Sequence, residues 1–185
     1  MKKGNFETIT CKTWNVVDAD GKTRISAVTS VNGTAGVTWL DKDGKKRMDA
    51  ATSAGGDAGV HWLDKDEKLR IAAVTCANGY SGVQWFDKDQ KRRIKASTFD
   101  DGDASIQLYD KDEKSRIAAI TLADGYAGVS WFDKDEKSRI KASTFADGEA
   151  SVQWNDKEEK MRISAGILAD GTVILPTIDE TPPQP

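Results

Sequence analysis

Apolar and polar residues alternate along most of the chain with a period of two, which is typical of β-strands. In residues 116–121, for example, Ile117, Ala119 and Thr121 fall on one face of an extended chain. The following segment, 127–132, repeats the alternation with alanine, valine and tryptophan on one face. No segment carries a helical apolar stripe longer than a turn or two. The pattern therefore predicts an all-β protein.

This alternation belongs to a unit of 23 residues that occurs seven times without an insertion. Each unit has an Asp, a second acid two residues later, a Lys, an Arg and a Gly at fixed positions. The first Asp stands at Asp18, Asp41, Asp64, Asp87, Asp110, Asp133 and Asp156. A 46-residue period lies over the first, because Tyr80 reappears as Tyr126 and residues 93–99 reappear as 139–145. Either a double repeat was recently duplicated, or successive repeats face different surroundings.

Each repeat contains two turn signals. The first is Asn-Gly or Asp-Gly in six of the seven repeats, as at Gly79 and Gly125, which supplies residues that tolerate a positive φ. The second is Asp-Lys-Asp-x-Lys, a polar loop whose Asp side chains can accept hydrogen bonds from their own backbone. Two strands of about six residues per repeat give about fourteen strands.

We therefore expect an elongated all-β repeat fold of seven two-strand units, and three chain paths fit it. These are a β-solenoid, an intertwined trimeric β-helix and, as the alternative, a hairpin meander. In a solenoid, equivalent Lys and Arg residues would stack about 4.8 Å apart as like-charge ladders, which the neighbouring Asp residues would relieve. In a meander or a trimer, equivalent Lys and Arg residues would lie farther apart, or would alternate with residues of other chains. Large apolar residues are few, and alanine and threonine occupy about half of the inward positions. This composition favours a core shared between chains, and so a homotrimer over a monomer.

The repeat pattern divides the chain into three parts. Residues 1–17 are expected to form a lead-in strand that caps the first repeat, and residues 18–176 hold the seven repeats. The seventh repeat loses the pattern after Gly171, and Pro176 cannot donate to a strand ladder. Residues 177–185 are predicted to be a proline-rich flexible tail.

Composition and charge exclude several classes of function. Of the 185 residues, 38% are hydrophobic and 31% are charged, with a net charge of −3. Without a clustered basic surplus, nucleic acid is not an expected partner. No apolar run approaches the ~18 residues of a membrane span. The start of the sequence has basic residues but no apolar segment behind them, so we expect a cytoplasmic or non-classically exported protein.

Catalytic and metal-binding signals are sparse. The one histidine, His61, is interpreted as a surface substitution, and Cys11 and Cys76 as ordinary small packing residues. The Asp-x-Asp turns resemble the start of a calcium loop, but later repeats replace its Gly with Glu or Gln and always follow with Lys. We interpret them as solvated turns with local ion pairs. The sequence predicts no enzyme, no cofactor and no metal site.

Aromatic residues provide the candidate ligand or subunit-interface positions. Five tryptophans occupy one repeat position, and two tyrosines lie beside the first turn: Trp39, Trp62, Trp85, Trp131, Trp154, Tyr80 and Tyr126. The tryptophans would supply the main core or interface mass, or form an exposed ladder for sugar rings. The tyrosines are better candidates for exposure.

The unit Asp-Lys-Asp-x-Lys-x-Arg-Ile, followed by Asp-Gly and Val-x-Trp-Phe, resembles a family of uncharacterised bacterial β-repeats of 23 residues. The resemblance covers about residues 14–175 and implies a repetitive, non-enzymatic β protein, with no site residues to transfer. Our leading hypothesis is a structural or interaction protein that self-associates as a fibre or stalk segment, or docks as an accessory subunit of a larger assembly. The alternative is a carbohydrate-binding repeat module with shallow aromatic sites.

Overall fold

The computed structural model describes residues 10–178, which form fifteen β-strands and no helix, and therefore no helix that could span a membrane. The chain divides into two compact units at Ala77 and Asn78. The first unit contains β1 (Thr13–Val17), β2 (Thr23–Thr29), β3 (Ala35–Leu40), β4 (Lys46–Thr52), β5 (Ala58–Leu63) and β6 (Leu69–Thr75). The second contains β7 (Ser81–Phe86), β8 (Arg92–Thr98), β9 (Ala104–Tyr109), β10 (Ser115–Thr121), β11 (Ala127–Phe132), β12 (Ser138–Thr144), β13 (Ala150–Asn155), β14 (Met161–Ile167) and β15 (Val173–Ile178).

Both predicted end segments extend beyond these residues. Strand β1 occupies the end of the predicted lead-in, while residues 1–9 lie outside the described part of the chain. Strand β15 runs to Ile178, so it includes the first two residues assigned to the tail. Residues 179–185 lie outside the described part. The three-part division therefore stays a prediction.

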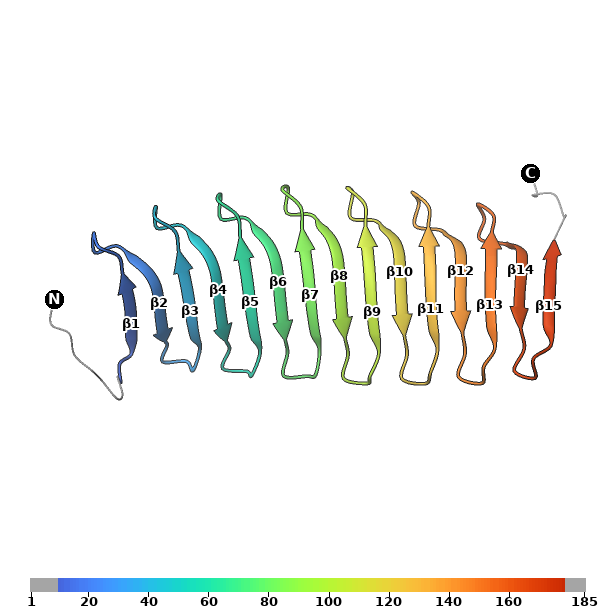
Figure 1. Cartoon of the computed structure of the whole chain (residues 1–185), viewed down its shortest axis with the longest axis horizontal. Coiled ribbons are helices and arrows are strands. Elements are labelled where there is room, and N and C mark those ends of the chain that lie inside the picture. The colour runs from blue at the N-terminus through green and yellow to red at the C-terminus, as the bar shows by residue number, and fades with distance from the viewer. Residues whose placement is uncertain (1–9, 179–185) are drawn as a thin grey trace. The chain divides into compact units, whose positions relative to one another are not determined.

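Within each unit the strands form an antiparallel meander. Each strand pairs only with its neighbours in sequence, as β10 does with β9 and β11, and the first and last strands of a unit have one partner within it. Figure 1 shows this side-by-side order in each unit. The predicted all-β repeat fold is confirmed, and each unit takes its hairpin-meander form as a single layer.

The pairing register gives each layer one apolar and one polar face. Between β11 and β12, Val129 lies opposite Ala142, while Ser130, one residue further along, lies opposite Lys141. Because successive side chains point to opposite faces, valine and alanine share one face, and serine and lysine share the other. The same relationship joins Val37 to Ala50 in the first unit. We call these the apolar face and the polar face.

The described part of each unit has no buried apolar core. Among the described residues, no hydrophobic side chain is fully buried. Three of the tryptophans on the apolar face keep more than a third of their surface exposed: Trp62 (39%), Trp131 (37%) and Trp154 (39%). A single layer has no second layer to cover this face, whereas domains normally bury such faces between two layers.

The two turn types close in similar ways. In the first type, Gly125 has a φ of 94° and its N–H donates to the carbonyl oxygen of Leu122 over 3.0 Å. In the second type, Gly21 and Gly44 occupy the left-handed position in the first repeats. Later repeats place Glu67, Gln90, Glu113, Glu136 and Glu159 there, with φ between 60° and 64°. The change from Gly to Glu, which argued against calcium loops in the sequence, therefore leaves the turn conformation unchanged.

Candidate functional site

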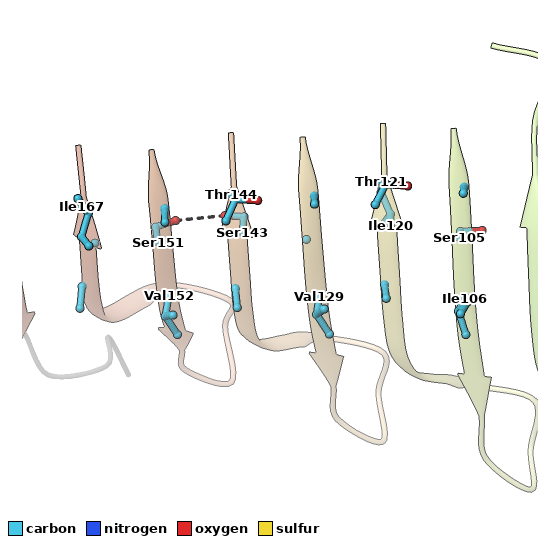
Figure 2. Close-up of a pocket in the computed structure, with 18 of the residues that line it drawn as sticks. Ser105, Ile106, Ile120, Thr121, Val129, Ser143, Thr144, Ser151, Val152 and Ile167 are labelled. Atoms are coloured by element: carbon cyan, nitrogen blue, oxygen red, sulfur yellow. Dashed lines mark hydrogen bonds between the residues drawn. The ribbon is translucent and has the colours of Figure 1, made fainter. Parts of the chain in front are cut away.

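The apolar face of the second unit forms a shallow trough of about 1190 Å³ that runs across β7 to β15. Its lining is mostly alanine, valine, isoleucine, serine and threonine. Figure 2 shows Ile106, Val129 and Val152 on alternate strands, with their side chains on one side of the sheet. No charged side chain lines the trough.

Three rows of side chains cross the strands on this face. One row consists of Trp85, Ile94, Leu108, Ile117, Trp131, Ile140, Trp154 and Ile163. The middle row consists of Val83, Ala96, Ile106, Ala119, Val129, Ala142, Val152 and Ala165. The third consists of Ser81, Thr98, Ala104, Thr121, Ala127, Thr144, Ala150 and Ile167. All three rows are uncharged over β7 to β14.

The predicted tryptophan positions all lie on the apolar face of their own unit. In the first unit, Trp39 and Trp62 both lie opposite Met48. In the second unit, Trp85, Trp131 and Trp154 each lie opposite an isoleucine of the next or preceding strand. Their role as an interface or as a ligand face stays a prediction.

Tyr80 and Tyr126 lie apart from the tryptophans, at the Asn-Gly and Asp-Gly turns. The Tyr126 ring meets Phe145 edge-on, with centroids 5.4 Å apart and an interplanar angle of 66°. Tyr80 and Phe99 repeat this arrangement at 5.6 Å and 63°. The Tyr80 hydroxyl lies over Gly82, where an added Cβ would approach it to 2.6 Å. Both tyrosines are half-buried, so each ring is a packing element and not the exposed aromatic that the sequence favoured.

Carboxylates join two other pairs of neighbouring turns on this edge. Asp57 Oδ1 accepts the backbone N–H of Ala77 over 2.9 Å, and Asp103 Oδ1 accepts that of Ala123 over the same distance. Asp103 and Tyr126 occupy equivalent positions in successive repeats. Aromatic pairs and carboxylate bonds therefore alternate between neighbouring turns, which gives the 46-residue period a structural reason.

The opposite edge is organised by the first Asp of each repeat. Asp133 Oδ1 accepts the backbone N–H groups of Asp135 (2.8 Å) and Lys137 (3.1 Å), and Oδ2 pairs with Arg139. Partial burial raises the pKa of Asp133, but the two N–H donors and the guanidinium lower it by more, so its pKa falls below the ordinary value of 3.8. The pKa is lowered for the same reasons at the equivalent residues Asp18, Asp41, Asp64, Asp87, Asp110 and Asp156.

Bonds from one repeat to the next run along this edge. Arg139 also donates to the carbonyl oxygen of Asp156, and Lys137 Nζ donates to that of Lys157 over 2.8 Å. Glu159 Oε1 accepts the backbone N–H of Ser138 over 3.1 Å. The charged turn residues are thus bound to neighbouring turns, as well as to their own.

Other candidate chemistry is limited in the described part of the chain. His61 is exposed and its Nδ1 lies 3.2 Å from the Asp49 carboxylate on the facing strand. Cys76 is half-buried, but Cys11 is exposed, so the prediction that Cys11 is a packing residue is wrong. Among residues 10–178, no group of three His, Cys, Asp or Glu residues has a geometry that could hold a metal ion.

The comparisons with known proteins show the fold alone. No protein-family model and no curated protein matches the sequence. The TCP domain of SAS-4 (dCPAP) from Drosophila melanogaster, solved with a proline-rich motif of Ana2 (dSTIL), is similar with a TM-score of 0.50 and 13% identity. That match covers 96% of this chain and 97% of the other. The match to a porin-like protein from Bacteroides uniformis covers 89% of this chain and 88% of the other at 10% identity. Its TM-score of 0.24 is too low to support a structural comparison.

Proposed function

We propose that the chain is a non-enzymatic structural protein whose apolar face is a protein-interaction surface, used first for self-association. The observation that carries this proposal is the absence of any fully buried hydrophobic side chain among residues 10–176. Folding has to offset roughly 1–2 kcal/mol of backbone entropy per residue, and apolar burial is the main term that does so. A partner that covers the apolar face would supply burial that the single layer lacks.

The fold likeness is consistent with an interaction role. The similar TCP domain was solved in complex with a proline-rich motif of another protein. A single-layer sheet leaves a whole face free for a partner, and here that face is apolar and uncharged across β7 to β14. Docking as an accessory subunit on a larger assembly is the second form of this proposal. It would use the same face.

Light scattering of the full chain over a wide range of concentrations tests self-association. We expect a constant mass above the 20.2 kDa of one chain. A mass of one chain at every concentration would contradict self-association and leave docking on another protein as the form to pursue. A mass of three chains would match the trimer expected from the sequence.

Carbohydrate binding is a second candidate, favoured by the half-exposed row of tryptophans. Trp131 and Trp154 lie two strands apart, about 9.6 Å, and present partly exposed rings on the same face. Stacked sugars would change tryptophan fluorescence and protect it from a soluble quencher. Unchanged fluorescence with a panel of glycans, at concentrations where the protein is folded, would exclude this candidate.

A further inference from the structure

The middle row of the apolar face is corrugated. In the second unit, valine or isoleucine stands on β7, β9, β11 and β13, and alanine stands on β8, β10, β12 and β14. Neighbouring strands lie about 4.8 Å apart, so ridges of branched side chains recur about every 9.6 Å with hollows between them. Figure 2 shows three of these ridges, at Ile106, Val129 and Val152.

A surface with this period is complementary to a copy of itself displaced by one strand. We propose that two copies of the chain pack these apolar faces together, with each ridge of one copy in a hollow of the other. A two-fold axis parallel to the strands, between β10 and β11, produces that displacement. It places Val129 over the second copy's Ala119, and Ile106 over the second copy's Ala142. This inference rests on the proposed function, and it identifies the partner of the apolar face as a second copy of the chain.

The size of the face fits such a pair. Eight strands at about 4.8 Å give a width of about 38 Å, and six residues at about 3.4 Å give a length of about 20 Å, so the face covers about 770 Å². A stable protein interface buries about 800 Å² on each partner. Two sheets packed face to face lie about 10 Å apart, a gap that side chains of these sizes fill. The area therefore suffices for a stable dimer.

Charge also favours a second copy on this face rather than on the other. The three rows of the apolar face over β7 to β14 hold no charged residue, so two identical copies meet without like-charge repulsion. The polar face carries Lys95 on β8 and Lys141 on β12, and a face-to-face pair about the same axis would place Lys141 only one strand from the second copy's Lys95. An isologous interface uses the same patch on both copies, which the apolar face allows.

The first experiment compares the native mass of the full chain with that of V129D and S130D. Val129 lies on the apolar face and its neighbour Ser130 lies on the polar face, so S130D is a matched control on the same strand. We expect the wild type and S130D to have the mass of two chains. V129D should raise the dissociation constant of the pair at least 100-fold and give single chains. Circular dichroism checks that each variant keeps its strands.

The second experiment tests the register through side-chain size, and it holds even if V129D fails to fold. V129A removes a ridge and A119V fills the hollow that it would enter, so each alone should weaken the pair about tenfold. The double variant V129A/A119V exchanges ridge and hollow, and should recover most of the lost affinity. Equal losses in the double variant and the single variants would overturn the one-strand displacement.

The outcomes separate this inference from the proposed function. A wild-type mass of one chain at all concentrations contradicts both. A wild-type oligomer that a folded V129D leaves intact keeps self-association but overturns the apolar face as its surface. A mass of three chains keeps self-association and overturns the two-fold pair.

Discussion

Phe145 packs edge-on against Tyr126, which stands nineteen residues earlier at the neighbouring turn, and the Tyr126 ring in turn covers Gly128. The same three residue types meet at Tyr80, Phe99 and Gly82. Aromatic pairs of this geometry contribute about 0.5–1.5 kcal/mol beyond the area that they bury. In a layer without a buried core, these pairs join neighbouring repeats at one edge, as the Arg, Lys and Glu hydrogen bonds do at the other.

The contact between Tyr126 and Gly128 predicts strong coupling between two substitutions. G128A places a Cβ into the Tyr126 ring and should destabilise the protein by about 1–3 kcal/mol. In a Y126A background the ring is gone, so the same change should cost less than about 0.5 kcal/mol. A double-mutant cycle by urea unfolding measures the difference. Additive effects would show that the ring does not rest on this glycine in solution.

The Asp and Arg pairs of the second turns predict a loss of stability in acid. The folded-state pKa of Asp133 and its equivalents is lowered, so their contribution is complete above the unfolded-state carboxyl pKa. It is lost as the pH falls through the ordinary value of 3.8 towards the lower folded-state pKa. We therefore expect the melting temperature to be nearly constant from pH 7 to about pH 5 and to fall steeply below about pH 4.

D133N provides the control for this prediction. The amide keeps an oxygen that can accept the N–H groups of Asp135 and Lys137, but it carries no charge for Arg139. The variant should be less stable at pH 7 and should lose less stability than the wild type between pH 5 and pH 3. An acid profile identical to that of the wild type would contradict a role for Asp133.

The backbone conformation of Glu136 and its hydrogen bond lead us to expect an unusual order of stability among three variants at this position. Its φ is 61°, and its Oε1 accepts the backbone N–H of Ser115 over 3.1 Å. A left-handed conformation costs a residue with a Cβ about 1–2 kcal/mol, which glycine avoids. E136A keeps that cost and loses the hydrogen bond, so it should destabilise by about 1 kcal/mol. E136G should be close to neutral, and E136Q should resemble the wild type. Equal effects of alanine and glycine in thermal unfolding would rule out this account.

The sequence predicted the local structure well because its signals are local. The period of two around Ile117 and the Asn-Gly turn at Gly79 define strands and turns whatever their partners are. The chain path was not predictable in this way, since a repeat of two strands fits a coil and a meander equally. Tyr126, Gly128 and Phe145 did recur together in alternate repeats. Their contact, however, depends on turns at the same edge being neighbours, which only the meander establishes.

The candidate site was predictable only in part for the same reason. Period-two alternation by itself places Val129 and Trp131 on a common face. It cannot show that the face lacks a covering layer, because that depends on whether distant strands fold back over it. The shared position of the tryptophans is therefore compatible with core, interface and ligand face alike. The register adds the alternation of valine and alanine across strands, from Val129 to Ala142 and onward.

Ser138 provides a final test of how tightly the edge formed by the second turns is packed. It is only 4% exposed, and its Oγ has no hydrogen-bond partner among the described residues. A buried hydroxyl without a partner costs about 1–3 kcal/mol, so S138A should leave stability unchanged or raise it by up to about 1 kcal/mol after the loss of packing. Its backbone N–H still donates to Glu159, so the turn contact survives.

The matched variant is S143A, because Ser143 Oγ lies 3.2 Å from Ser151 Oγ and this bond would be lost. We expect S143A to lower the free energy of unfolding by about 0.5–1 kcal/mol. A larger loss in S138A than in S143A would mean that Ser138 has a hydrogen-bond partner in solution.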